Sequence, residues 1–436
     1  MFISKYLNNK MPSIIRLTQA KFDKRNDGTQ AINIAIGNVS LPMHPAMRKR
    51  MFELNSLGSP FKNGIVKYSS SEGFKESQKS FLNIISSSGF DVDNLHVQIT
   101  DGASLGIELC VLGLSGKNNS NRNSILIFDP IYTTYKYMAE RLGRSIISMP
   151  RSLNRNNKFI MPSINLIEKQ IKKYSPSALL VIPYDNPTGQ YYTKKQMIEL
   201  AKLCVKYNMW LISDEAYREL YYAKGKPTSV WGITDSVVPG IHGKRVSIES
   251  ASKVWNACGL RIGAIVSDNA DFIKKIQAEY TIYVCPNVIG QYIFGALANE
   301  KKENLKKWYS KQRKYYSKII LNTSESIIKN IQGIVVTKPE AAMYFIVDFN
   351  NITGDSFTAY DFSMYCAEKG SVKIGSKNYT LLMSPISPFY KDAVSKNSKA
   401  QKQIRISCVE NEKNMKKVPV ILEHLFFQYI KKTKKI

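Results

Sequence analysis

A lysine and an arginine that could act together lie in the segment SIESASKVWNACGLRIGAIVSD, residues 247–268. Lys253 follows an apolar, β-branched run, and Arg261 comes eight residues later with a glycine two positions away on each side. A lysine amine can bond covalently to a carbonyl compound as a Schiff base, and a guanidinium can bind a phosphate through two hydrogen bonds. Among 62 lysines and arginines the pair alone is unremarkable, because a single lysine is ordinarily a solvated surface residue.

The elements around this segment alternate between short strands and helices. Apolar, β-branched runs are typical of buried strands, and they occur at 95–100, 124–129, 178–183, 209–213, 245–250 and 260–267. Helical patterns separate them, as at 135–143 and 193–208. Such alternation predicts an α/β fold with a mostly parallel sheet and helices on both faces.

Beyond residue 300 the pattern changes. Residues 299–331 read as one long amphipathic helix, and short strands at 343–349 and 403–409 precede a closing helix at 418–432. A chain of 436 residues exceeds what one core usually supports. We expect three parts: an N-terminal arm that shares the small domain, a large domain that binds a cofactor, and an interdomain helix with a smaller α+β domain, at 1–49, 50–300 and 301–436.

The residues after the strands carry the chemistry, because ligands of an open α/β sheet bind beyond the carboxyl ends of its strands. Five consecutive strand ends are followed by small, polar or aromatic groups. In chain order these are Gly102, Ala103 and Ser104, then Tyr132, then Asn186, then Asp214 and Tyr217, then Ser250 and Lys253. We expect them to converge on one site.

This set matches the needs of pyridoxal 5′-phosphate. Lys253 would be its covalent handle, and Asp214 could keep a proton on its ring nitrogen. Asn186 and Tyr217 could bind its phenolic oxygen, while Tyr132 offers an aromatic face for the ring. The cup for its phosphate is expected from Gly102, Ala103, Ser104, Ser250 and Arg261.

Composition argues against several other classes. The formal charge of +28 could attract nucleic acid, but the basic residues run through the whole chain instead of clustering, so we expect no nucleic-acid partner. No apolar run reaches the roughly 18 to 20 residues of a membrane span. Six cysteines and four histidines are scattered without a CxxC pair, which fits reduced thiols and no metal site. The basic N-terminus lacks the Ser and Arg density of a transit peptide, and we expect a cytoplasmic protein.

With these residues in place, the chain resembles the class I/II aminotransferases, which are aspartate aminotransferase-like enzymes of PLP fold type I. The segments that carry the resemblance span nearly the whole chain in the family's order: IAIGNVSLP, Tyr68 with Glu72-Gly73, DGAS, DPIY, NPTG, SDEAY, SASKVWNACGLRIG and IRIS. The resemblance implies a mostly parallel, seven-stranded sheet with helices on both faces, together with a smaller α+β domain.

The resemblance also implies roles for individual residues. The catalytic set is Lys253, which would shuttle the substrate proton, with Asp214 and Tyr217. Arg405 in QIRIS would bind the substrate α-carboxylate with help from the N–H of Gly37. The substrate-binding residues are therefore Gly37, Asn186 and Arg405. Tyr68 would reach the phosphate bound by a partner subunit, so a homodimer with shared active sites is expected.

Three functions remain open on the sequence. The first is an amino-acid:2-oxo-acid aminotransferase working by ping-pong transamination, and the second is a carbon–sulfur β-lyase or other eliminating enzyme of the same fold. The third is a PLP-responsive DNA-binding regulator, which would need a winged helix where only about 30 residues precede INIAIG. Two segments depart from the family, GNVSLPMHP and the long polar excursion at 384–403, and the amino donor cannot be named.

Overall fold

The computed structural model describes residues 2–433 except 119, 121, 224, 393, 394, 396 and 397. Within them, seven strands form the larger sheet, in the order β2-β10-β9-β8-β7-β3-β4. Only β10 runs antiparallel to its neighbours. The strands are β2 (His96–Thr100), β3 (Ser124–Asp129), β4 (Ser145–Pro150), β7 (Ala178–Val181), β8 (Trp210–Asp214), β9 (Arg245–Ser250) and β10 (Gly263–Ser267). The expected mostly parallel sheet is confirmed.

The larger sheet is buried on both faces. Successive residues of β3 enter different apolar clusters, with Leu126 and Phe128 in one and Ile125 and Ile127 in the other, because side chains alternate across a strand. Helices α5 (Ala103–Leu114), α6 (Thr134–Arg141) and α9 (Ala270–Tyr280) supply the second cluster. The first cluster draws on α4 (Lys75–Ser87), α7 (Ile164–Tyr174), α8 (Lys194–Lys206) and α10 (Val288–Gly295). The expectation of helices on both faces is confirmed.

The strands of the larger sheet begin and end within three residues of the sequence-based expectation, apart from β4, which was not predicted. That strand lies at the edge of the sheet and is only partly buried. Its residues, SIISMP, mix serines with apolar side chains, so the sequence carries no continuous apolar run there. A partly solvated edge strand gives a weaker sequence signal than a fully buried central one.

The C-terminal part contains two small sheets. One has the order β11-β12-β16-β15 and the other β1-β14-β13. Their strands are β1 (Gln30–Asn33), β11 (Val335–Val336), β12 (Tyr344–Asp348), β13 (Val372–Ile374), β14 (Lys377–Leu382), β15 (Ser384–Pro385) and β16 (Gln403–Ser407). Since β1 pairs in parallel with β14, residues near the N-terminus share a sheet with the C-terminal part.

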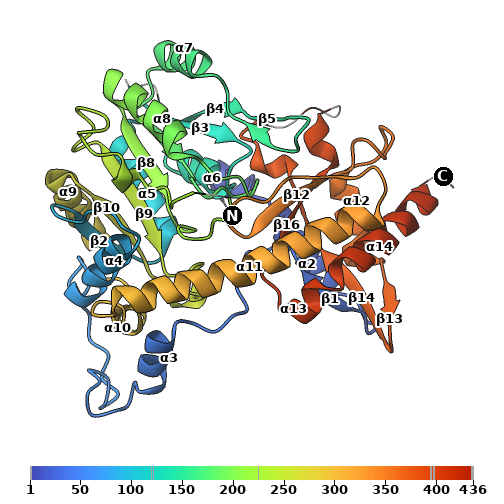
Figure 1. Ribbon diagram of the computed structural model, residues 1–436, viewed down its shortest axis with the longest axis horizontal. Helices are drawn as coiled ribbons and strands as arrows, with labels where there is room; N and C mark the ends of the chain where they lie inside the picture. Colours follow the sequence, from blue (N-terminus) through green and yellow to red (C-terminus); the bar gives the residue numbers. More distant parts are fainter. Residues whose placement is uncertain are drawn as a thin grey trace.

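A long helix, α11 (Lys302–Asn330), connects the two parts of the molecule. It begins beside α4 and α10, below the large sheet, and runs across to α14 (Val418–Thr433) and the small sheets (Figure 1). The other helices of the C-terminal part are α12 (Ala359–Glu368) and α13 (Glu412–Met415). None of the helices among the described residues is long and apolar enough to cross a bilayer.

The N-terminal arm lies over both parts. It contains α1 (Lys5–Asn8) and α2 (Ile14–Phe22), and α2 packs on α12, β14 and β15. On the other side, the Nζ of Lys10 lies 3.0 Å from Glu140 of α6. The helix α3 (Pro45–Phe52) packs on α10, and the segment after it extends away from the body (Figure 1, blue, lower left).

Candidate active site

A cavity of about 240 Å³ lies beyond the carboxyl ends of the large-sheet strands and reaches the small sheets. Its walls contain Gly37, Ala103, Ser104, Tyr132, Asn186, Asp214, Tyr217, Ser250, Lys253, Arg261 and Arg405. Of the residues predicted for the site, the structure thus brings all but Gly102 and Tyr68 into one lining, and Gly102 lies directly behind Arg261.

The sheet register explains why Gly102, Ser250 and Arg261 meet. Gly263, the first residue of β10, pairs with Thr100 at the end of β2 and with Ser250 at the end of β9. Because β10 runs antiparallel to both, its beginning lies at the same edge as their ends. Arg261 is two residues before that beginning, so the edge collects all three residues.

Glycine is required where this edge is tightest. Gly102 has φ +83°, and a Cβ there would lie 2.3 Å from the Nη2 of Arg261. A Cβ on Gly263 would lie 2.5 Å from the backbone N of Ala103. Gly102 is also the N-cap of α5, where no side chain accepts from the first turn. The backbone N–H groups in the first turn of α5 are therefore not occupied by a capping side chain.

Lys253 points across the cavity toward the N-terminal residues. Its Nζ donates to the carbonyl of Gly37 over 2.5 Å. A Cβ on Gly37 would lie 3.2 Å from that Nζ and 2.3 Å from the hydroxyl of Tyr344. The glycine thus leaves room for a lysine and a tyrosine that approach from different parts of the fold.

Asp214 ends β8 as a buried carboxylate held through both oxygens. Its Oδ1 accepts from the backbone N of Ala216 over 3.1 Å, and its Oδ2 accepts from the hydroxyl of Tyr135 over 2.5 Å. Burial raises the pKa of Asp214, and the hydrogen bond from Tyr135 opposes that rise. For the tyrosine the effects add, since burial and the neighbouring carboxylate both raise the pKa of Tyr135. Tyr135 is therefore the proton donor of this pair.

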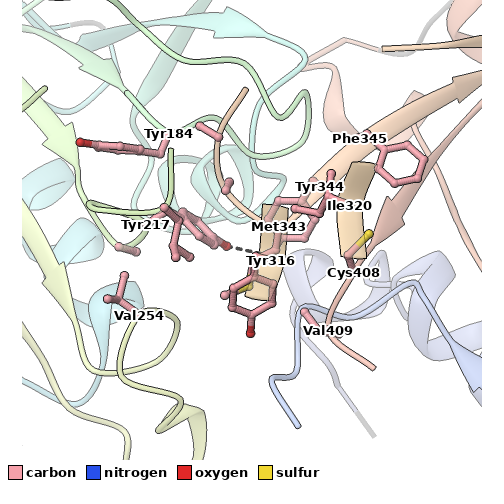
Figure 2. Packing of buried hydrophobic residues seen from close by; sticks show 14 of the residues in the cluster. Tyr184, Tyr217, Val254, Tyr316, Ile320, Met343, Tyr344, Phe345, Cys408 and Val409 are labelled. Carbon is pink, nitrogen blue, oxygen red and sulfur yellow. Dashed lines mark hydrogen bonds between the residues drawn. The ribbon is translucent and has the colours of Figure 1, made fainter. Parts of the chain in front are cut away.

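Asn186 and Tyr217 each contact the C-terminal part. The Oδ1 of Asn186 accepts from Arg405 over 2.8 Å, and the hydroxyls of Tyr217 and Tyr344 lie 2.8 Å apart (Figure 2). Burial raises the pKa of Tyr217 well above its ordinary value, and Tyr344 adds to the rise. Both residues thus hold polar contacts between large-sheet loops and small-sheet strands.

Arg405 is 3% exposed although it carries a charge. Beside Asn186, it donates to the carbonyl of Ala35. The rings of Tyr344 and Phe389 lie 4.6 Å and 4.8 Å from its Cζ. Buried arginine needs partners, and here a polar pair and two ring faces provide them.

The polar excursion at 384–403 supplies one of those rings. Its described residues contain β15 and a turn of 3₁₀ helix at Ser387–Phe389. The backbone of Phe389 accepts from Ile131 over 2.8 Å, and Lys136 donates to the carbonyls of Pro388 and Tyr390. The excursion is therefore anchored on the large part; its residues 393, 394, 396 and 397 lie outside the described ones.

Sequence reasoning missed several cavity residues. Tyr135 lies in the first turn of α6, three residues after Tyr132, and the centroids of the two rings are 5.6 Å apart. Tyr344 lies at the start of a buried strand and carries no motif, so only the paired β12 and β16 bring it to Arg405. The other lining residues outside the predicted set are Ile15, Ile36, Ile182, Ala216 and Ser252.

Tyr68 lies elsewhere. It is 82% exposed and does not line the cavity of its own chain. Among the described residues, no group of three or more His, Cys, Asp or Glu side chains could hold a metal ion.

Comparisons with known proteins agree with this geometry. The probable kynurenine–oxoglutarate transaminase of Saccharomyces cerevisiae is 26% identical over 347 residues, covering 77% of this chain and 73% of the yeast protein. The aspartate aminotransferase of Sulfolobus acidocaldarius is 24% identical over 365 residues, or 83% of this chain and 85% of the relative.

Solved structures show the same fold. The N-succinyldiaminopimelate aminotransferase of Mycobacterium tuberculosis superposes with a TM-score of 0.79 at 17% identity, over 98% of this chain and 100% of that one. The putative kynurenine aminotransferase of Saccharomyces cerevisiae gives 0.78 at 21% identity, over 98% and 99%. The family model for aminotransferase class I and II matches residues 29–420. Since that match spans most of the chain, the protein belongs to the class I and II aminotransferases and is a transferase of amino groups.

Proposed function

We propose that the cavity binds pyridoxal 5′-phosphate and that the enzyme transfers the amino group of an amino acid to a 2-oxo acid. One observation carries the proposal. A lysine, a buried carboxylate and two arginines, Lys253, Asp214, Arg261 and Arg405, face one cavity. Each of the four has a chemical use in binding this cofactor or an amino acid.

The residues fit a phosphorylated pyridine. The guanidinium of Arg261 makes hydrogen bonds of 3.2 Å and 3.4 Å to the carbonyls of Cys258 and Asp101, which are long for a charged donor. It therefore keeps donor capacity for a phosphate. The uncapped start of α5 adds backbone N–H groups at a positive helix end. Ser250 would contribute its hydroxyl.

At the ring end, Asp214 would hold a proton on the pyridine nitrogen. Its raised pKa limits how firmly it stays ionised, and the hydrogen bond from Tyr135 favours the ionised form. Asn186 and Tyr217 would hold the phenolic oxygen, and Tyr132 would cover a ring face. When bound, the cofactor supplies an electron sink that makes the Cα–H of an amino acid acidic.

The remaining steps belong to the protein's own groups. The Nζ of Lys253 would hold the cofactor covalently and, once displaced, act as the base that takes the proton from the amino-acid Cα. Arg405, with the N–H of Gly37, would bind the α-carboxylate. Since two hydrogen bonds and two aromatic rings together already hold the guanidinium of Arg405, its orientation needs no further ordering when the substrate binds.

The eliminating alternative uses the same residues, so geometry does not separate it from transamination. Relatives named for aminotransferase activity, including kynurenine–oxoglutarate and aspartate aminotransferases, favour transfer. We propose amino acids and 2-oxo acids as the substrates.

We propose further that the enzyme is a homodimer with shared active sites. The segment that carries Tyr68 leaves the body of the chain (Figure 1) and exposes large apolar side chains. They include Phe52, Leu57, Ile65 and Val66, each more than half exposed. A cluster of this kind marks an interaction surface, and a second copy would cover it while bringing Tyr68 to the neighbouring phosphate.

Mixing two impaired variants, at a cofactor concentration too low to saturate Tyr68→Ala, tests the shared site. Tyr68→Ala should weaken cofactor binding, and Lys253→Ala should stop turnover. Mixed dimers contain one site in which both residues are intact, so up to about a quarter of wild-type activity should return if the sites are shared. Activity no higher than the sum of the two variants, or a monomer by ultracentrifugation that is fully active, would refute the shared site.

The division into parts also remains a proposal. We infer an N-terminal arm at 1–49 that belongs with the small domain, a large domain at 50–300, and the interdomain helix with the small domain at 301–436. The pairing of β1 with β14 supports placing the arm with the C-terminal part. Limited proteolysis that releases a stable fragment crossing these boundaries would count against them.

For location we propose the cytoplasm. All six cysteines are free thiols, and four of them are buried, as expected where no disulfides form. Fractionation of cells expressing the full chain would decide this.

The central test is chemical. Purified enzyme given pyridoxal 5′-phosphate should become yellow, and borohydride followed by peptide mapping should find the cofactor on Lys253. A screen of amino acids should then bleach the colour with a subset of donors, and the colour should return with a 2-oxo acid. Cofactor found on another lysine would refute the assignment; pyruvate and ammonia from a cysteine conjugate without amino transfer would favour the lyase.

A further inference from the structure

Tyr344, the first residue of β12, touches three groups of the proposed site. Its side chain is 1% exposed. Its hydroxyl lies 2.8 Å from that of Tyr217, and Figure 2 shows the two rings meeting from opposite sides of the boundary between the parts. Its ring lies 4.6 Å from the Cζ of Arg405. Its hydroxyl also fills the space that a Cβ on Gly37 would need.

The ring of Tyr344 fixes the plane of Arg405. A planar guanidinium pairs with a carboxylate through two hydrogen bonds only when the carboxylate lies in the plane of the guanidinium, at its edge. Asn186 and Ala35 hold two of its nitrogens, while Tyr344 and Phe389 cover it with aromatic rings. Loss of the Tyr344 ring would leave the guanidinium free to tilt.

The hydroxyl of Tyr344 has a separate consequence. A tyrosine hydroxyl donates one hydrogen and can accept two. If Tyr217 gives its hydrogen to the ring oxygen of the cofactor, its own oxygen can accept only from a second donor. Tyr344 is in position to be that donor. Hydrogen bonds joined in this way strengthen one another in a buried site.

The backbone at Tyr344 is fixed by the turn that carries Asn186. Gly189 of that turn has φ +68°, and a Cβ there would lie 2.1 Å from the carbonyl oxygen of Tyr344. The backbone N–H groups of Glu340 and Ala341 both donate to the carbonyl of Gly189 over 2.8 Å. Tyr344 is thus held against the same turn that holds Asn186, which in turn binds Arg405.

We propose that Tyr344 is a positioning residue that couples the two halves of the site. Its ring orients Arg405 for the substrate carboxylate, and its hydroxyl keeps the hydrogen of Tyr217 directed at the ring oxygen of the cofactor. This inference rests on the proposed function, and it concerns a residue outside every motif of the sequence.

Two substitutions separate the two roles. Tyr344→Phe removes only the hydroxyl, and Tyr344→Leu removes the ring as well. Tyr316→Phe is the matched control, because Tyr316 is a buried tyrosine of the same cluster (Figure 2) whose hydroxyl has no hydrogen-bond partner among the described residues. The readouts are the pH at which the visible absorption of bound cofactor titrates, measured without substrate, and the KM and kcat for a reactive amino acid.

Tyr344→Phe should raise the titration pH by roughly half a unit, with kcat falling a few-fold and KM unchanged. The reason is that a hydrogen bond to the ionised ring oxygen lowers the affinity of the coloured group for its proton, and this bond weakens when Tyr217 loses its donor. Tyr344→Leu should show the same titration shift and raise KM roughly tenfold. Tyr316→Phe should leave both readouts at wild-type values.

The failures are distinguishable. A wild-type protein that acquires no visible absorption with pyridoxal 5′-phosphate would refute the proposed function itself. If the wild type is coloured but the absorption of Tyr344→Phe titrates at the same pH as that of the wild type and of Tyr316→Phe, the coupling is refuted while the function stands. Should Tyr344→Leu not fold, Tyr344→Phe, which keeps the packing volume, still decides the inference. A Leu variant that folds and keeps the wild-type KM would refute the role of the ring.

Discussion

Arg261 and Arg405 face the same cavity but are held in different ways. Arg261 is exposed and bonds to two backbone carbonyls, one of them only three residues away. Arg405 is 3% exposed, and its contacts come from Ala35, Asn186, Tyr344 and Phe389. The first arginine is placed by a local turn; the second is placed by four segments that meet only in the folded chain.

This difference has energetic consequences. An exposed charge interacts through a high effective dielectric and is screened by salt, so single contacts there are worth little. A buried charge that loses a partner leaves polar groups unpaired, which costs more. Substitutions at the Arg405 end should therefore disturb both substrate binding and local packing, whereas those at the Arg261 end should mainly change cofactor affinity.

The largest effect is expected at Lys253, which lies between the two ends. Lys253→Ala removes the covalent handle and the base for the Cα proton, and general base catalysis alone is worth roughly 10² to 10⁴ in rate. Arg261 and Asp214 should still bind the cofactor without a covalent bond. Equilibrium dialysis should therefore find the cofactor bound, while rapid mixing with an amino acid shows binding without turnover.

A conservative variant sharpens this expectation. Lys253→Arg keeps a long basic side chain but cannot form the covalent link, so its rate should match that of Lys253→Ala. If Lys253→Ala transaminated at close to the wild-type rate, the role of Lys253 would have to be abandoned, whatever the two arginines do.

The comparison between the arginines is tested by the same change at both. Arg405→Lys keeps the charge but loses the planar fork and its stacking on two rings. We expect KM for the amino acid to rise roughly 30-fold, about 2 kcal/mol, the order of a charge-assisted hydrogen-bond pair. Arg261→Lys should weaken cofactor affinity only about threefold, because the side chain is exposed.

Titration of each variant with cofactor and with amino acid gives both numbers. Thermal denaturation should show a lower melting temperature for Arg405→Lys than for Arg261→Lys, since only the first disturbs buried contacts. Equal losses in binding and in stability at the two positions would show that the difference in burial between Arg261 and Arg405 has no energetic consequence.

The sequence could place the residues of the Arg261 end at one edge of the sheet for a physical reason. Gly102, Ser250, Lys253 and Arg261 lie at strand ends, and a parallel sheet gathers the carboxyl ends of its strands on one edge. Local patterns therefore determine that end of the cavity. Even the antiparallel β10 fits, because its beginning lies at this edge.

At the Arg405 end, local patterns say less. Arg405 itself came from a family resemblance, and neither Tyr344 nor Phe389 was predicted. Their contacts depend on the pairing of β12 with β16 and on a loop that returns to the large part. Contacts between segments far apart in the chain leave no spacing signal in either segment. Tyr135 was missed for another reason: a buried tyrosine on a helix face is indistinguishable in sequence from ordinary core packing.

The smallest effect that we predict concerns Tyr135, whose hydroxyl donates to Asp214 over 2.5 Å. Burial raises the pKa of Asp214, and this hydrogen bond lowers it. Tyr135→Phe should therefore raise that pKa further, because it removes the one side-chain hydrogen bond that favours the ionised carboxylate. Since the ionised carboxylate is the form that would hold the ring proton, cofactor affinity should fall on the acid side at a higher pH than in the wild type.

The direction of the pH shift follows from which form of Asp214, ionised or neutral, binds the protonated ring. Below the pKa of Asp214 the carboxyl is neutral and cannot balance a protonated ring, so affinity is lost as the pH falls through that value; raising the pKa moves the loss upward. Tyr280→Phe is the matched comparison, because Tyr280 is a buried tyrosine that donates to Asp101 over 3.0 Å next to Gly102. Its loss should leave the pH dependence of cofactor affinity unchanged, since Asp101 is not expected to contact the ring. Cofactor affinity should be measured from pH 5 to 9 for the two variants and the wild type. Coincident curves would show that the hydrogen bond from Tyr135 does not tune the carboxyl group of Asp214.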